Sequence, residues 1–93
     1  MPRNRKDIES GLLNKGFNRK EGDHSFFIYW TREGRKTAVF TKTSHNEKQI
    51  SDSLLSMMAK QCRVTNKQFA SLLDCSLDQN GYEVELRRQT VIG

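Results

Sequence analysis

Several kinds of residue are scarce in this sequence. It contains one proline, two cysteines and two histidines among 93 residues. Its longest wholly apolar run covers residues 26–30, far short of the ~20 residues of a membrane-spanning helix. No apolar signal region follows Met1. We therefore expect a cytoplasmic protein that does not enter a membrane.

The scarcity of thiols and imidazoles argues against a metal or redox site. Cys62 and Cys75 lie too far apart in the sequence for a CxxC motif. Together with His24 and His45 they make four potential ligands, but their spacing matches no zinc pattern. We expect no metal ion, no cofactor and reduced cysteines, as is usual for cytoplasmic proteins.

Positive charge is present in excess. Lys and Arg number 16 against 11 Asp and Glu, which gives a net charge of +5 and a pI near 9.5. Residues 1–48 carry 11 basic and 6 acidic residues, whereas residues 49–93 carry 5 of each. A basic half attracts polyanions, of which nucleic acid is the commonest. The alternative is a solvated surface with no partner.

Local patterns predict a helix followed by three strands. Ile8, Leu12 and Leu13 fall on one face of a helix. Asp7 can cap this helix, and Gly16 can end it in a left-handed conformation. The expected strands are residues 17–21, 24–31 and 35–41. Because tight turns join them, we expect an α+β domain with an antiparallel three-stranded sheet.

The middle strand is apolar and aromatic on both of its faces. One face carries His24, Phe26, Ile28 and Trp30, and the other carries Ser25, Phe27, Tyr29 and Thr31. Helices on one side of the sheet can cover only one of these sets. We therefore expect aromatic side chains on the other face, where they shield one another, stack on bases or contact a protein.

A second helix is expected after the sheet. Apolar residues at helical spacing carry it to about Gln61, and either Ser44 or Ser51 can begin it. The division expected from these patterns is a domain over residues 1–61 and a helical C-terminal extension over residues 62–93, packed on that domain.

The extension contains a weak repeat of two short helices. Thr65 and Asp78 are cap residues at equivalent places, and an aromatic residue and a leucine follow each of them. The second helix is open to question, because Gly81 interrupts it and the apolar residues that follow also alternate as in a strand.

Residues 7–61 combine several short motifs in the order helix, three strands, helix. The motifs are Ile8, Leu12 and Leu13 before Gly16 and Phe17; Gly22, Asp23, His24, Ser25, Phe26 and Phe27; and Ser44, His45, Asn46, Glu47 and Lys48 before Leu54. In this order they resemble HicA-family toxins, small mRNA interferases with a double-stranded-RNA-binding-domain-like α-β-β-β-α fold. The sequence departs from the family at Asp23, where serine is usual, and residues 62–93 have no counterpart.

The resemblance implies a toxin of a type II toxin–antitoxin system. Such a toxin cleaves mRNA without a metal ion, with His24 as the catalytic residue and an antitoxin protein as partner. RNA carries its own nucleophile, the 2′-hydroxyl, and histidine with its unperturbed pKa near 6.5 can accept or donate the protons. The expected RNA contacts are Lys20, Arg35, Lys36, Lys42 and His45.

Two other functions fit the same residues. One is a non-catalytic RNA-binding module on the same fold. The other is a protein-interaction subunit, in which the helical pair of residues 65–86 forms a homodimer or docks on another protein, as the neutral charge of that half suggests.

Overall fold

The protein is an α+β domain. The computed structural model describes residues 3–22, 24–44, 48–74 and 76–90. The elements in chain order are β1 (Arg3–Asn4), α1 (Arg5–Asn14), β2 (Phe17–Glu21), β3 (Ser25–Trp30), β4 (Lys36–Thr43), β5 (Gln49–Ile50), α2 (Asp52–Gln61), α3 (Asn66–Leu73) and α4 (Gln79–Arg88). The described residues thus contain four helices and an antiparallel three-stranded sheet of order β2-β3-β4, which confirms the prediction of an α+β domain with such a sheet.

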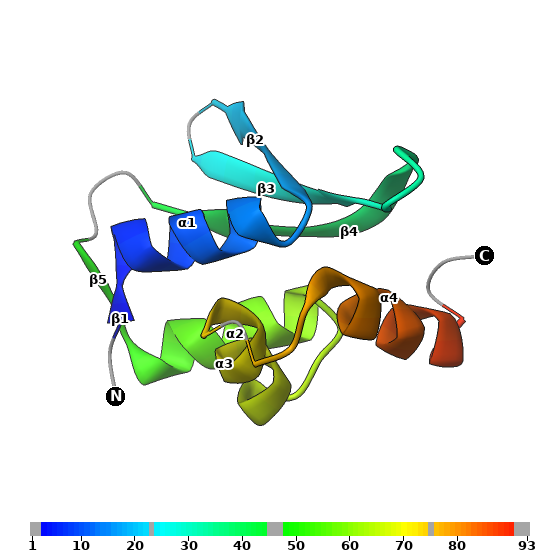
Figure 1. The fold of residues 1–93 in the computed structure, drawn as a ribbon. Coiled ribbons are helices and arrows are strands. Elements are labelled where there is room, and N and C mark those ends of the chain that lie inside the picture. The colour runs from blue at the N-terminus through cyan, green and yellow to red at the C-terminus, as the bar shows by residue number, and fades with distance from the viewer. Residues whose placement is uncertain (1–2, 23, 45–47, 75, 91–93) are drawn as a thin grey trace.

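The sheet and the helices form separate layers. In Figure 1 the sheet lies at the top and the helices lie below it. The alternation along β3 agrees with this arrangement, because Ser25, Phe27 and Tyr29 are buried toward the helices. The side chains between them along β3 point to the opposite side of the sheet.

Helix α1 starts three residues earlier than the sequence suggests. Asn4 is its N-cap and accepts a hydrogen bond from the Lys6 amide, so the prediction that Asp7 caps the helix is wrong. Ile8 is buried as expected, whereas Leu13 is 43% exposed and does not join the apolar face. Gly16 follows the helix with φ +95°, which confirms the left-handed stop.

Helix α2 begins at the second of the two possible caps. The Ser51 hydroxyl accepts a hydrogen bond from the Leu54 amide. The capping pattern that begins at Ser44 extends into residues 45–47, which lie outside the described residues. A short strand that the sequence did not predict precedes the helix, because β5 pairs with β1 in antiparallel register.

The two C-terminal helices follow the repeat in the sequence. Thr65 and Gln68 form a reciprocal capping box at the start of α3. Asp78 caps α4 by accepting a hydrogen bond from the Gly81 amide. Helix α4 continues through Gly81, so the strand alternative is wrong.

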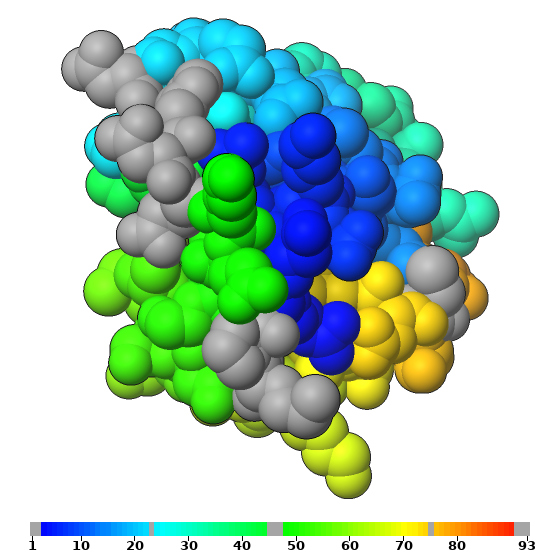
Figure 2. Space-filling view, turned by 90° about the vertical axis from the view of Figure 1, so that its left-hand side faces the viewer, coloured from blue at the N-terminus to red at the C-terminus, as the bar shows by residue number. Residues whose placement is uncertain are grey.

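The predicted domain of residues 1–61 and the predicted extension of residues 62–93 both contribute residues to one hydrophobic core. The Tyr82 ring of α4 lies 4.9 Å from the Tyr29 ring and 5.8 Å from the Phe17 ring. The Tyr82 hydroxyl donates to the Cys62 carbonyl oxygen at 2.7 Å. On the surface seen in Figure 2, the blue residues of β1 and α1 lie between the green residues of β5 and α2 and the yellow residues of α3. The boundary after Gln61 stays a prediction.

Candidate nucleic-acid interface

The side of the sheet that points away from the helices carries three cross-strand rows. Directly paired residues of antiparallel strands place their side chains on the same side of a sheet. The rows are Lys20, Phe26 and Lys42; Asn18, Ile28 and Phe40; and Trp30 with Lys36. We call these eight side chains the open face. Its lysines, Asn18 and Phe40 are exposed, and its other apolar side chains are half-buried.

Charge is segregated between the two sides of the sheet. The eight side chains of the open face include three lysines and no carboxylate. On the helix side, the Arg19 guanidinium pairs with Glu9 at 2.7 Å and with Glu21 at 2.9 Å, so that cation is neutralised locally. Three basic residues of the first half of the sequence thus lie on the open face, and among its eight side chains no carboxylate offsets their charge, which attracts polyanions.

His24 lies at one end of the open face, directly before β3. Its side chain is half-buried, and its ring meets the Phe26 ring edge-on with centroids 6.3 Å apart. His24 and Lys42 also line a pocket of about 100 Å³ together with Leu54 and Met57 of α2. Pockets that hold small molecules are about 300–1,000 Å³. A nucleotide is too large for this pocket, so any RNA would lie across its mouth.

The structure divides the predicted RNA contacts into two groups. Lys20 and Lys42 share a row beside His24, whereas Lys36 pairs with Trp30 at the far end of β3. Six residues of extended chain separate His24 from Trp30, which corresponds to roughly 20 Å. Arg35 lies in the exposed turn before β4, at that far end.

Two of the sequence-based site predictions fall outside the described residues. They are His45, predicted to contact RNA, and Asp23, which precedes His24 in the motif that resembles the HicA family. Sequence reasoning also missed Phe40 of the open face, which is 44% exposed. The signal for it was present, since Phe40 alternates with buried Val39 and Thr41 along β4.

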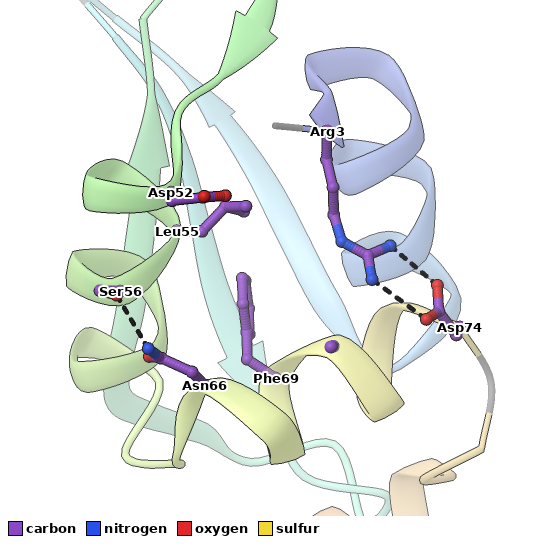
Figure 3. A pocket seen from close by; sticks show the side chains of 8 residues that line it. Arg3, Asp52, Leu55, Ser56, Asn66, Phe69 and Asp74 are labelled. Atoms are coloured by element: carbon purple, nitrogen blue, oxygen red, sulfur yellow. Dashed lines mark hydrogen bonds and ion pairs between the residues drawn. The ribbon is translucent and has the colours of Figure 1, made fainter. Parts of the chain in front are cut away.

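A second pocket lies between β1, α2 and α3, on a different side of the molecule (Figure 3). Its volume is about 760 Å³, and Leu55 and Phe69 form an apolar part of its lining. At its rim the Arg3 guanidinium donates to both carboxylate oxygens of Asp74 at 2.8 and 3.0 Å. The guanidinium lowers the pKa of the Asp74 carboxyl. Because this pocket holds a balanced ion pair and no lysine lines it, it suits a polyanion less well than the open face does.

The described residues offer few alternatives to His24 for chemistry. No three His, Cys, Asp or Glu side chains within the described part of the chain are placed to hold one metal ion. The Cys62 thiol is buried, and burial raises its pKa to about 12, so it stays protonated and unreactive at neutral pH. In the same part of the chain, no helix is long and apolar enough to cross a membrane.

Comparisons with protein-family models, curated proteins and solved structures found no match for this chain. What the open face does must therefore be inferred from its own side chains.

Proposed function

We propose that this protein binds RNA on the open face and cleaves it with His24, as a metal-independent endoribonuclease of the HicA toxin type. The observation that carries the proposal is the position of His24 at the end of the open face, whose eight described side chains include no carboxylate, next to the row that contains Lys20 and Lys42. A proton-transfer group thus lies where a bound phosphodiester would pass.

Binding follows from the charge and exposure of the lysines. Lys20 and Lys42 are exposed on either side of Phe26, and Lys36 extends the positive charge to the far end of the sheet. Each phosphate that a lysine neutralises releases condensed counterions, so the affinity should fall steeply with salt. With three lysines the open face would give moderate affinity that does not depend on sequence.

Cleavage would use the nucleophile that RNA itself carries. The 2′ oxygen bonds to phosphorus while the bond from phosphorus to the 5′ oxygen breaks, which leaves a 2′,3′-cyclic phosphate and a 5′-hydroxyl. His24 makes one of the two proton transfers, from the 2′-hydroxyl or to the 5′ oxygen, and water makes the other. Lys42, which lines the same pocket, would stabilise the charge that develops on the phosphoryl oxygens.

The order and layering of the elements support the finer fold proposal. Apart from the short strand β5 before α2, helix α1, the strands β2, β3 and β4, and helix α2 follow one another in the α-β-β-β-α order of the double-stranded-RNA-binding-domain-like fold. A toxin of this type would act on mRNA in the cytoplasm and would be held inactive by an antitoxin protein. To inhibit cleavage, that partner would have to cover His24 and the lysines beside it.

The test is cleavage of a single-stranded RNA by the purified protein in EDTA, with wild type and His24→Ala compared. We expect wild type to yield 2′,3′-cyclic phosphate ends and His24→Ala to lose at least about 100-fold in rate. Binding of an RNA that carries 2′-O-methyl groups, and so cannot be cleaved, should be nearly equal for the two proteins. Equal cleavage rates, or cleavage that depends on a metal ion, would contradict the role of His24.

One observation favours RNA binding without cleavage as the second candidate function. Cleavage needs two proton transfers, but within the described residues His24 is the one imidazole at the open face. The residues that α2 contributes to the same pocket include the apolar Leu54 and Met57, which cannot transfer a proton. The same assay decides between the two functions. Tight binding of the methylated RNA with no cleavage of ordinary RNA by wild type would favour the binding module.

A further inference from the structure

We infer that the RNA on the open face is single-stranded, with bases stacked on Phe40, Phe26 and Trp30. This inference depends on the proposed function, because it names the form of RNA that the same surface takes. Aromatic rings in the middle of a cationic sheet face have a use in binding unpaired bases, whereas a phosphate backbone alone would need only the lysines.

The rings are placed so that bases can reach them. Phe40 and Phe26 lie in neighbouring rows of the open face, with centroids 6.4 Å apart and ring planes tilted by 49°. Phe40 is 44% exposed although it is a large apolar side chain. The described helices all lie on the other side of the sheet (Figure 1), so no described helix covers these rings.

The order of charges and rings fits a strand that crosses the sheet. Lysines lie on both sides of Phe26 in its row, and Lys36 lies beside Trp30 at the far end. A single strand can place its phosphates near these ammonium groups and turn its bases toward the rings between them. Every base has a flat π face, so this mode of binding tolerates many sequences.

A duplex would use this surface poorly. The bases of an A-form helix are stacked on one another, and proteins recognise it by its shape, its phosphates and its 2′-hydroxyls. Against a duplex, the rings of Phe26, Trp30 and Phe40 would meet sugar and phosphate groups and would lose water without gaining a stacking partner. Stacking on aromatic side chains is instead typical of sheet-based readers of single strands.

The charge of the face favours RNA over a protein partner as the occupant. An exposed aromatic patch by itself is typical of protein interfaces, which are depleted in lysine. Here three lysines and no carboxylate accompany the rings within the eight side chains of the open face. That combination complements a polyanion with apolar bases.

The test is equilibrium binding of an uncleavable 2′-O-methyl RNA of about eight nucleotides, as a single strand and as a duplex with an unmodified complementary RNA, whose 2′-hydroxyls keep the contacts by which duplexes are recognised. We expect wild type to bind the single strand more tightly. Phe40→Ala should weaken that binding by about 5- to 150-fold, the range measured for loss of one stacked base. Phe40→Tyr keeps a ring and should retain the affinity. Leu13→Ala is the matched control, since Leu13 on α1 is 43% exposed and lies away from the open face.

The salt dependence separates stacking from charge. For single strands, each lost phosphate contact lowers the slope of log affinity against log salt by about 0.7. Lys42→Gln should reduce the slope by that amount, whereas Phe40→Ala should leave the slope unchanged. Lys67→Gln, which removes an exposed lysine from α3, should change neither slope nor affinity.

The outcomes distinguish this inference from the function on which it depends. If wild type binds neither single strand nor duplex, the proposed RNA function itself is wrong. If wild type binds RNA but prefers the duplex, or if Phe40→Ala binds the single strand as tightly as wild type, the stacking inference is wrong. In that last case the exposed rings would belong to a protein contact.

Discussion

Replacing Glu83 by glutamine should destabilise the protein substantially, because this carboxylate connects α4 to the sheet. Its side chain is 2% exposed and accepts hydrogen bonds from three donors. The donors are the Tyr29 hydroxyl at 2.8 Å, the backbone amide of Arg32 and the Arg87 guanidinium at 3.1 Å. Two of these donors belong to β3 and the turn after it, so Glu83 joins the C-terminal helix to the end of the sheet.

The size of the effect follows from the change of acceptor. Hydrogen bonds to a charged group contribute about 1.5–3 kcal/mol and those to a neutral group about 0.5–1.5 kcal/mol. Glutamine keeps the shape and one acceptor oxygen, but Tyr29 and Arg32 then donate to a neutral group, and the new NH₂ group faces Arg87. We expect Glu83→Gln to lower the free energy of unfolding by about 2–3 kcal/mol, and the Tm by roughly 10–20 °C.

The assay is urea unfolding followed by circular dichroism and by the fluorescence of Trp30, the one tryptophan of the chain. Arg88→Ala is the control, since it breaks only an exposed ion pair with Glu85 and should cost less than about 1 kcal/mol. A loss below about 0.5 kcal/mol for Glu83→Gln would refute the reasoning, because it would mean that the buried carboxylate does not hold these donors.

Two further predictions concern pH and backbone strain. In the folded protein, burial raises the pKa of the Cys62 thiol to about 12, whereas the thiol of the unfolded chain ionises near its ordinary pKa of 9.0. The unfolded state therefore binds fewer protons above pH 9, and stability should fall as the pH rises from about 9 to about 12. Urea unfolding at several pH values should show a shallower fall for Cys62→Ala, and an unchanged slope would contradict the raised pKa. Gly16 and Gly34 both have positive φ, but a Cβ at Gly16 would press on the Gln79 side chain and lie 3.1 Å from the backbone carbonyl oxygen of Trp30, whereas one at Gly34 would meet nothing within 4 Å. Gly16→Ala should therefore cost more than Gly34→Ala, which carries the backbone strain of about 1–2 kcal/mol alone, and equal losses would show that the close approach of the β3 backbone is unimportant.

The local features of the fold could be predicted from the sequence because they depend on neighbouring residues. The period-two pattern of β3, the left-handed Gly16 and the capping box of Thr65 and Gln68 are all set within a few positions of the chain. The prediction that Asp7 caps α1 was wrong because Asn4 and Asp7 are both residue types that suit an N-cap. Their choice depends on the pairing of β1 with β5, which brings together residues far apart in the sequence.

The candidate site was predictable only in part, for a similar reason. The alternation of β3 placed His24 and Phe26 on one face. Which lysines lie beside them depends on the register in which β2 and β4 pair with β3. That register, with its irregularity between Ile28 and Trp30, places Lys42 beside His24 and Lys36 at the far end of the sheet. No local pattern fixes such a register. The position of Tyr82 in the core was equally invisible, because it depends on how α4 docks against the sheet.

The central claim is that RNA lies on the open face, and an NMR titration tests it most directly. Backbone amide shifts of the protein would be followed while a short single-stranded 2′-O-methyl RNA is added. We expect the largest shift changes at His24, at residues 25–30 of β3 and at residues 36–42 of β4. Residues 66–73 of α3 should change little. Changes concentrated on α1 and α3, with β3 and β4 unaffected, would contradict the claim.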